Sequence, residues 1–140
     1  MSWEIETIDS AGDVGYASSI MLDSLEQPHI CYNDMTKGDL KYAYCNGSSW
    51  IIATVDSDGR VGSHTSFALD SDGSPRISYS DYSHNDLKYA YNNGSSWEIE
   101  TVDRDGWVGE WTSLALDSND RPYISYFDTT NKDLKYAWFG

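Results

Sequence analysis

Basic residues are scarce in this sequence. Its 140 residues contain 9 Lys and Arg against 23 Asp and Glu, which gives a formal net charge of -14. Binding to a phosphate backbone depends on Lys and Arg side chains that displace counterions, and an anionic lipid surface repels an acidic protein in the same way. We therefore expect neither nucleic acid nor a membrane as a partner.

Long apolar runs and cysteine motifs are absent as well. No stretch approaches the ~18 apolar residues of a membrane span. Met1 is followed by Ser-Trp-Glu rather than by a basic and then apolar signal segment, so we expect a soluble chain without a signal peptide, in a compartment that the sequence leaves open. Cys31 and Cys45 form neither a disulfide framework nor a metal motif. They can pair when oxidised, but two buried free thiols fit them better.

The residues that are abundant are those of turns and short strands. Aromatic residues make up 14% of the chain, there are 11 Gly, and 17 of the acidic residues are Asp. Aspartate and glycine favour turns, while aromatic residues favour strands. This composition predicts an all-β protein with many short strands.

The chain repeats itself at an offset of 47 residues. Aligned positions carry the same residue in all three copies: Trp3/Trp50/Trp97, Asp9/Asp56/Asp103, Gly15/Gly62/Gly109, Pro28/Pro75/Pro122 and Leu40/Leu87/Leu134. A fixed period of this length indicates stacked or radial units that cannot bury their apolar faces alone.

One repeat contains four strand-like runs separated by turn signals, which in the second repeat are Thr65–Asp70, Arg76–Asp81, Leu87–Tyr91 and Trp97–Val102. The connections are too short for crossover helices, so each unit is predicted to be a four-stranded antiparallel meander. In the first run bulky Phe67 and Leu69 alternate with Ser66 and Ala68, as expected when one sheet packs on the next. This size and pattern favour a β-propeller blade over a β-sandwich or a solenoid.

The phrase "SLALDS..RPYISYFD....DLKYA", read over residues 113–137 and matched twice upstream, resembles propeller repeats of large bacterial and archaeal surface proteins. The resemblance covers essentially the whole chain and implies a propeller fold. Those repeats mostly have no assigned activity, so the resemblance implies no catalytic residue.

The repeats divide residues 1–140, a single propeller half, into a strand at 3–9, blades at 16–55 and 63–102, and an incomplete blade at 110–138. Three blades at roughly 120° leave wedges too wide to fill, since propellers have about four to eight blades. We therefore expect a C2 homodimer, a six-bladed ring in which strand 3–9 of one chain completes blade 110–138 of the other. A fragment of a longer propeller and an engineered chain remain open, and both would dimerise in this way.

No motif for catalysis, metal or cofactor stands out. The Asp-Ser-Asp-Gly runs at 56–59 and 70–73 lack the spacing of a calcium loop and fit a turn. The Asp residues around residues 34–39, 81–86 and 128–133 recur in every repeat, which favours turn capping over acid–base chemistry. His29, His64 and His84 occupy three different repeat positions. We expect no catalytic residue, no metal and no cofactor, and hence a protein that is not an enzyme.

The repeats differ from one another most in two kinds of loop, those before each blade and those between its second and third strands, which we expect on one rim of the ring. The candidate ligand-binding residues on this rim are Tyr16, Arg60, His64, Tyr82, Trp107, Trp111 and Phe127. Aromatic faces beside polar groups favour a lectin-like carbohydrate-binding module. The alternatives are a purely structural or engineered propeller, with these aromatics as filling between blades, and a sialidase-like glycoside hydrolase, for which four Arg per chain are few.

Overall fold

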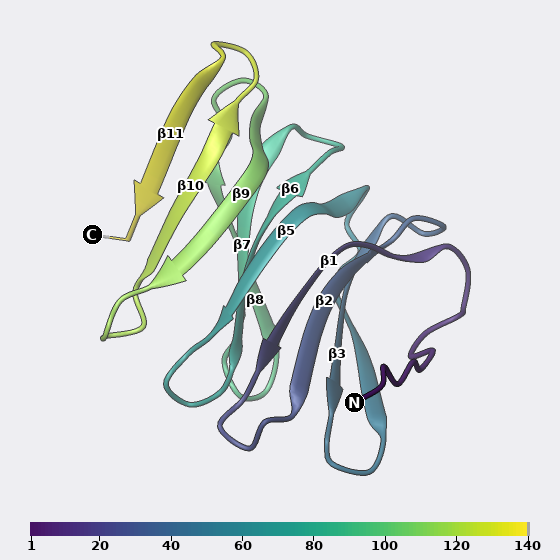
Figure 1. Cartoon of the computed structure of the whole chain (residues 1–140). Helices are drawn as coiled ribbons and strands as arrows, with labels where there is room; N and C mark the ends of the chain where they lie inside the picture. The colour runs from purple at the N-terminus through teal and green to yellow at the C-terminus, as the bar shows by residue number, and fades with distance from the viewer. Residues whose placement is uncertain (140) are drawn as a thin grey trace.

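The computed structural model describes residues 1–139, in which eleven strands form three antiparallel sheets (Figure 1). The first sheet has the order β1-β2-β3-β4: β1 (Val14–Leu22), β2 (Pro28–Asp34), β3 (Asp39–Cys45) and β4 (Trp50–Asp56). The second has the order β5-β6-β7-β8: β5 (Val61–Leu69), β6 (Pro75–Asp81), β7 (Asp86–Asn92) and β8 (Trp97–Asp103). The third contains β9 (Val108–Leu116), β10 (Pro122–Asp128) and β11 (Asp133–Trp138).

The all-β expectation is confirmed, since none of residues 1–139 is helical. Accordingly, this part of the chain has no helix that is long and apolar enough to cross a membrane. Each sheet is a meander because hairpin connections of a few residues join sequential strands. The three sheets stand side by side in an open arc, with the two termini at its opposite ends (Figure 1). Closure of this arc into a ring stays a prediction.

The first strand of each sheet begins earlier than its hydrophobic pattern indicated. Strand β5 starts at Val61 rather than at Thr65, because a bulge shifts its register against β6 between Ser63 and Ser66. His64 lies within this bulge with a left-handed φ of 50°, and Ala17 and Trp111 occupy the same position in β1 and β9. Three copies of one bulge show that the repeat encodes it.

The core lies between neighbouring sheets rather than within any one of them. Leu87 and Tyr89 of β7 pack with Val108, Ile124 and Tyr126 of the third sheet. A similar cluster joins the first two sheets, with members Cys31, Leu40, Tyr42, Val55, Val61, Phe67, Ile77, Tyr79 and Ala90. The alternation of bulky and small residues thus serves the packing of sheet on sheet, as the sequence indicated.

A repeated hydrogen bond ties each sheet to the segment before it. The Tyr79 hydroxyl on β6 donates to Oδ2 of Asp56, the last residue of β4, over 2.8 Å. The equivalent pairs are Tyr126 with Asp103 at 2.7 Å and Tyr32 with Asp9 at 2.7 Å. Burial and the neighbouring carboxylate raise the pKa of Tyr79, so its hydroxyl stays protonated and donates.

Replacing Tyr79 with phenylalanine should show what this bond contributes. The variant leaves Oδ2 of the buried Asp56 without its donor, so we expect the free energy of unfolding to fall by about 1.5–3 kcal/mol in urea denaturation. Tyr32→Phe is the matched control, because its acceptor Asp9 is partly exposed and water can replace the hydroxyl. Equal losses in the two variants would contradict a role for burial.

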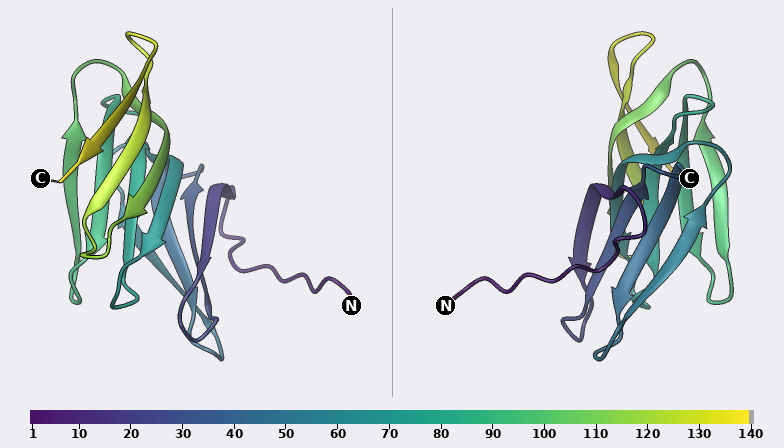
Figure 2. Two further views of the ribbon diagram at one scale, coloured as in Figure 1. Left: turned by 60° about the vertical axis from the view of Figure 1, so that its left-hand side comes forward. Right: turned by 90° about the vertical axis from the view of Figure 1, so that its right-hand side faces the viewer.

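Residues 1–10 carry no strand in the single chain. Figure 2 shows the N-terminus extending away from the sheets, whereas Asp9 contacts the first sheet through its bond from Tyr32. Its part 3–9 reads WEIETID, while β8, a regular strand, reads WEIETVD. The two sequences differ only at one position, where Ile8 corresponds to Val102. The different conformations therefore reflect the neighbours: β8 pairs with β7, whereas no strand of the described residues pairs with segment 3–9. The predicted pairing of this segment with a second chain stays a prediction.

Candidate functional site

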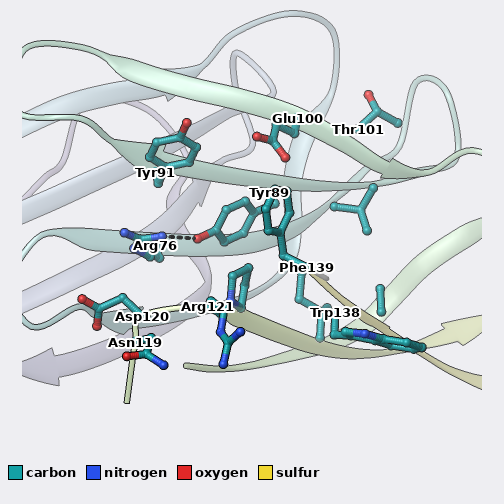
Figure 3. A pocket seen from close by; sticks show the side chains of 14 residues that line it. Arg76, Tyr89, Tyr91, Glu100, Thr101, Asn119, Asp120, Arg121, Trp138 and Phe139 are labelled. Carbon is teal, nitrogen blue, oxygen red and sulfur yellow. Dashed lines mark hydrogen bonds between the residues drawn. The ribbon is translucent and has the colours of Figure 1, made fainter. Parts of the chain in front are cut away.

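A pocket of about 550 Å³ lies between the second and third sheets, at the edge of the sheets where the hairpin joins β9 to β10 (Figure 3). Its lining combines aromatic rings, two arginines and two carboxylates: Arg76, Tyr89, Tyr91, Glu100, Thr101, Val102, Asn119, Asp120, Arg121, Pro122, Ile124, Ala137, Trp138 and Phe139. Concave sites with apolar walls and a few polar groups are typical of small-ligand binding.

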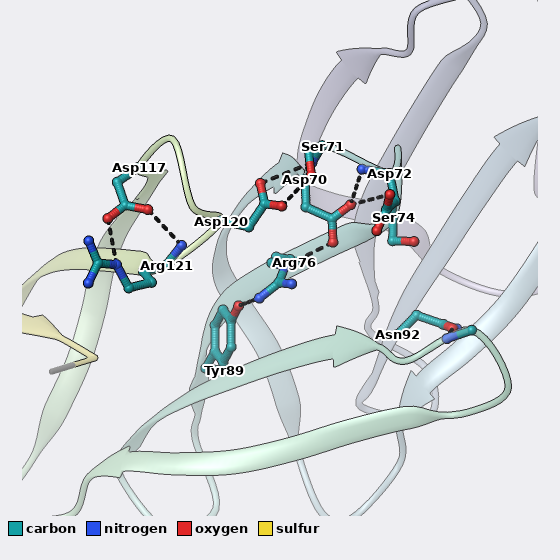
Figure 4. Close-up of polar contacts among 11 residues, drawn as sticks. Asp70, Ser71, Asp72, Ser74, Arg76, Tyr89, Asn92, Asp117, Asp120 and Arg121 are labelled. Atoms are coloured by element: carbon teal, nitrogen blue, oxygen red, sulfur yellow. Dashed lines mark hydrogen bonds and ion pairs between the residues drawn. The ribbon is translucent and has the colours of Figure 1, made fainter.

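Arg76 is held from three sides at the second position of β6 (Figure 4). Its Nε donates to Oδ2 of Asp70 over 3.1 Å, its Nη1 donates to the Tyr89 hydroxyl over 3.1 Å, and its Cζ lies 5.5 Å from the centre of the Tyr91 ring. Burial by itself lowers the pKa of Arg76, but the bonds to Tyr89 and Asp70 outweigh it and raise that pKa. The guanidinium is therefore a fixed cation with unused donors.

The hairpin loop 117–121 forms the opposite polar wall. Oδ1 of Asp117 accepts the backbone N–H groups of Asn119 and Arg121 over 2.8 and 3.0 Å, and its Oδ2 accepts Nε of Arg121 over 2.8 Å. The bond from the Arg121 backbone holds the pKa of Asp117 below its usual range. Asp120 accepts the backbone N–H of Ser71 over 3.0 Å, which links this loop to that of the second sheet (Figure 4).

This lining offers the contacts that a sugar uses. Guanidinium groups donate to hydroxyl oxygens, and the Glu100 and Asp120 carboxylates accept from hydroxyl hydrogens. The rings of Tyr91 and Trp138 offer flat apolar faces to the C–H side of a pyranose. The pocket therefore suits a small polyhydroxylated ligand.

The sequence reasoning did not single out this pocket, although its own criterion points there. Arg76 aligns with His29 and Tyr123, so the repeats differ at the centre of the pocket. Arg121 aligns with Gln27 and Ser74, again three different residues. The largest differences between repeats were expected in the loops at the other end of the sheets, but the positions of Arg76 and Arg121 also differ in all three repeats.

None of the seven residues predicted to bind ligand lines this pocket. Arg60 and Trp107 lie in the connections before β5 and β9, and Tyr82 lies in the turn after β6. The structure brings Arg60 and Tyr82 together, since the Tyr82 backbone N–H donates to the Arg60 carbonyl over 2.8 Å. Trp107 contacts the neighbouring turn through a bond from the Thr129 N–H to its carbonyl over 2.9 Å.

The other four predicted residues lie at separate places in the structure. The rings of His64 and Trp111, from β5 and β9, lie 4.2 Å apart between their centres. Tyr16 is exposed on β1 at the open end of the arc, opposite Asn33. Phe127 pairs with Leu134 within the third sheet. The structure therefore does not bring all seven into one site, and their role in binding stays a prediction.

The repeated acidic residues contact backbone groups of their own turns. Oδ1 of Asp34 accepts the N–H groups of Thr36 and Lys37 over 3.0 and 3.1 Å, and Asp128 accepts that of Asn131 over 3.1 Å. This is the capping role that the sequence indicated. Within residues 1–139 no three His, Cys, Asp or Glu side chains gather as metal ligands would.

The histidines and cysteines lie in separate surroundings. His29 contacts Asp23 over 2.9 Å, and His84 contacts Asp81 over 2.9 Å. Both cysteines are free, but only Cys31 is buried as expected, whereas Cys45 is half-buried. Burial raises the pKa of the Cys31 thiol to about 12, which keeps it protonated and unreactive.

Comparison with known proteins gives a likeness of fold. No protein-family profile matches the sequence, and no curated protein is similar to it in sequence. The structure is similar to that of a fucose lectin from Kordia zhangzhouensis, solved in complex with methyl-fucoside. The TM-score is 0.62 at 15% identity, and the match covers 87% of this chain and 91% of the lectin chain.

Proposed function

We propose that this protein is a non-catalytic, lectin-like module that binds carbohydrate in the pocket between the second and third sheets. The observation that carries the proposal is the fixed Arg76 guanidinium, placed among aromatic rings and beside the loop of Asn119, Asp120 and Arg121. The likeness of the fold to a fucose lectin supports it.

The pocket also weighs against the two other hypotheses raised by the sequence. A purely structural propeller predicts a surface without a concave aromatic site, whereas this pocket has both aromatic and charged walls. A sialidase-like hydrolase needs a cluster of arginines, but Arg60 and Arg104 lie in loops at the opposite end from Arg76 and Arg121. Binding is the function that this distribution favours.

The proposal includes the ring. Two copies of the three-sheet arc are proposed to close into a six-bladed propeller with C2 symmetry, which places two pockets on one face of the particle. Two sites on one rigid particle bind a multivalent glycan surface with much higher avidity than one site does. The rim formed by Arg60, Tyr82 and Trp107, at the opposite edge of the sheets from the pocket, is a second surface that we propose to test for glycan binding.

Binding is tested first with methyl-fucoside and with a glycan array. For any glycan that binds, we expect Arg121→Gln to weaken affinity by about tenfold, or ~1.4 kcal/mol, because it removes a charged donor from the pocket. Glutamine is tolerated in this loop, since Gln27 occupies the position in the first sheet.

Arg104→Gln is the matched control, with the same change of charge in a loop far from the pocket, and should bind like the parent protein. A protein that binds no array glycan at high concentration would contradict the proposed function. Equal weakening in the two variants would move the site away from the pocket.

A further inference from the structure

The third sheet exposes side chains that its two counterparts bury. Leu40 and Leu87 are 0% exposed, whereas Leu134, at the same repeat position on β11, is 84% exposed. Tyr42 and Tyr89 are 5% and 4% exposed, and the equivalent Tyr136 is 57% exposed. The residues at each position are identical in the three repeats, so the difference arises because none of residues 1–139 packs on the face of β11 that carries Leu134 and Tyr136.

The other end of the arc shows the complementary vacancy. A Cβ atom placed on Gly62 would lie 2.9 Å from the Cα of Leu40, and one on Gly109 would lie 2.7 Å from the Cα of Leu87. Gly15, the third copy of this glycine, has no atom within 4 Å of the same point. The repeat therefore has a glycine where the backbone of a leucine from the preceding sheet approaches closely, and no leucine approaches Gly15.

A hollow of about 280 Å³ lies at this place on the first sheet. Its lining is mostly apolar: Thr7, Ile8, Asp9, Val14, Gly15, Ser18, Ile30, Tyr32 and Ala43. The corresponding positions one repeat later are Val55 of β4 and Val61, Ile77, Tyr79 and Ala90 of the second sheet, and these residues belong to the same core cluster as Leu40. The hollow is therefore lined by the kind of apolar side chains that surround a buried leucine.

The unpaired segment 3–9 and the open edge of β11 show the same complementarity. In the second sheet, β8 pairs with β7 so that Trp97 lies opposite Asn92, Ile99 opposite Ala90 and Thr101 opposite Lys88. Trp97 also reaches the first sheet, where its ring lies 5.6 Å from that of Tyr42 in an edge-on arrangement. In the third sheet β11 is paired on one side only, with β10.

One chain cannot satisfy both ends, because β1, which lines the hollow, and β11 lie at opposite ends of the arc (Figure 1). We infer that a second copy of this chain fills both, with Leu134 of one copy seated over Gly15 of the other. Residues 3–9 then pair with β11 of the other copy in the register of β8 on β7, placing Trp3 opposite Phe139, Ile5 opposite Ala137 and Thr7 opposite Lys135. This inference deepens the proposed ring and rests on it.

The inferred register also places Trp3 in the ligand pocket. Trp97 packs on Tyr42 between the first and second sheets, so Trp3 of the second copy packs on Tyr89 between the second and third. Tyr89 is the residue whose hydroxyl binds Arg76. The second copy therefore covers the part of the pocket around Tyr89, and the polar end, with Asn119 and Arg121, stays open to ligand.

The test is the particle mass by light scattering over a dilution series. We expect the parent protein to have twice the 15.8 kDa of one chain, and Leu134→Asp to have the mass of one chain. Leu134 is exposed in the single chain, so this variant should keep its sheets, as circular dichroism would show.

Leu25→Asp is the matched control. Leu25 is 78% exposed, but Asp72 occupies its position in the second sheet without disturbing the contact with the first, so this variant should remain a dimer. A parent protein with the mass of one chain would overturn the inference, as would Leu134→Asp and Leu25→Asp proteins of equal mass.

A second pair of variants tests the strand. Successive N–H groups of a strand point to opposite sides, so proline at both Ile5 and Glu6 removes a bond to β11 in either alignment, and we expect a single chain. Ser2→Pro, just outside the pairing, should stay dimeric. Glycan binding is scored separately: a dimer that binds no sugar contradicts the proposed carbohydrate site and leaves the present inference standing. A parent protein that binds sugar as a single chain contradicts the ring and the present inference and leaves the carbohydrate site standing.

Discussion

Replacing Gly109 with alanine is expected to lower the free energy of unfolding by about 3–5 kcal/mol. The new Cβ would lie 2.7 Å from the Cα and 3.0 Å from the backbone N of Leu87, and these atoms belong to a paired strand that cannot move alone. The residue also has a φ of +95°, a conformation that costs about 1–3 kcal/mol for a residue with a side chain. Crowding of a packed core adds about the same again.

Gly94→Ala separates these two causes. Gly94 has a φ of +100° in an exposed turn, and a Cβ there meets no atom within 4 Å, so only the conformational part should be lost. Urea denaturation of both variants, at a concentration where the association state is the same, measures the difference. Equal losses would show that the close approach of β7 to Gly109 contributes nothing.

Leu87→Ala should destabilise the protein by about 2–5 kcal/mol. Leu87 is 0% exposed and packs between the second and third sheets with Tyr89, Val108 and Ile124. Shortening it removes buried apolar surface and leaves a cavity that two hydrogen-bonded sheets cannot close. Since this core joins the second and third sheets, we expect the variant to unfold in a single transition whose urea midpoint is lower than that of the parent protein.

Leu25→Ala serves as the control for this variant. It makes the same change at a leucine that is 78% exposed in a loop, where little surface is returned to water. We expect a loss within about 0.5 kcal/mol in the same urea titration. A loss at Leu87 as small as that at Leu25 would contradict a core built between sheets.

The fold was largely predictable because each turn and strand pattern occurs three times in the sequence. Glycine and aspartate mark the turns, the alternation around Phe67 marks a face, and the offset of 47 residues aligns the copies. The bulge at His64 was not predicted, because its left-handed residues are Ala17, His64 and Trp111, none of which signals that conformation in a sequence. The bulge is encoded through its surroundings rather than through the residue that adopts it.

The candidate site was predicted less well. The sequence reasoning favoured aromatic residues at one end of the sheets, and the pocket lies at the other end, around Arg76 and the loop 117–121. The arginine has no local signal, since Asp70, Tyr89 and Tyr91, which hold it, lie 6 to 15 residues away along the chain. Which side chains converge on one point depends on the packing of sheets, and spacing along the chain does not record it.

The sequence by itself determined the strand, its turns and its period, because these depend on residues a few positions apart. Only the tertiary structure decided which copy of a repeated residue is buried. Leu40, Leu87 and Leu134 have the same local sequence, and so nearly do residues 3–9 and 97–103, yet their environments differ. Burial depends on which residues pack alongside: a neighbouring sheet packs on Leu40 and Leu87, whereas no described residue of the chain covers Leu134.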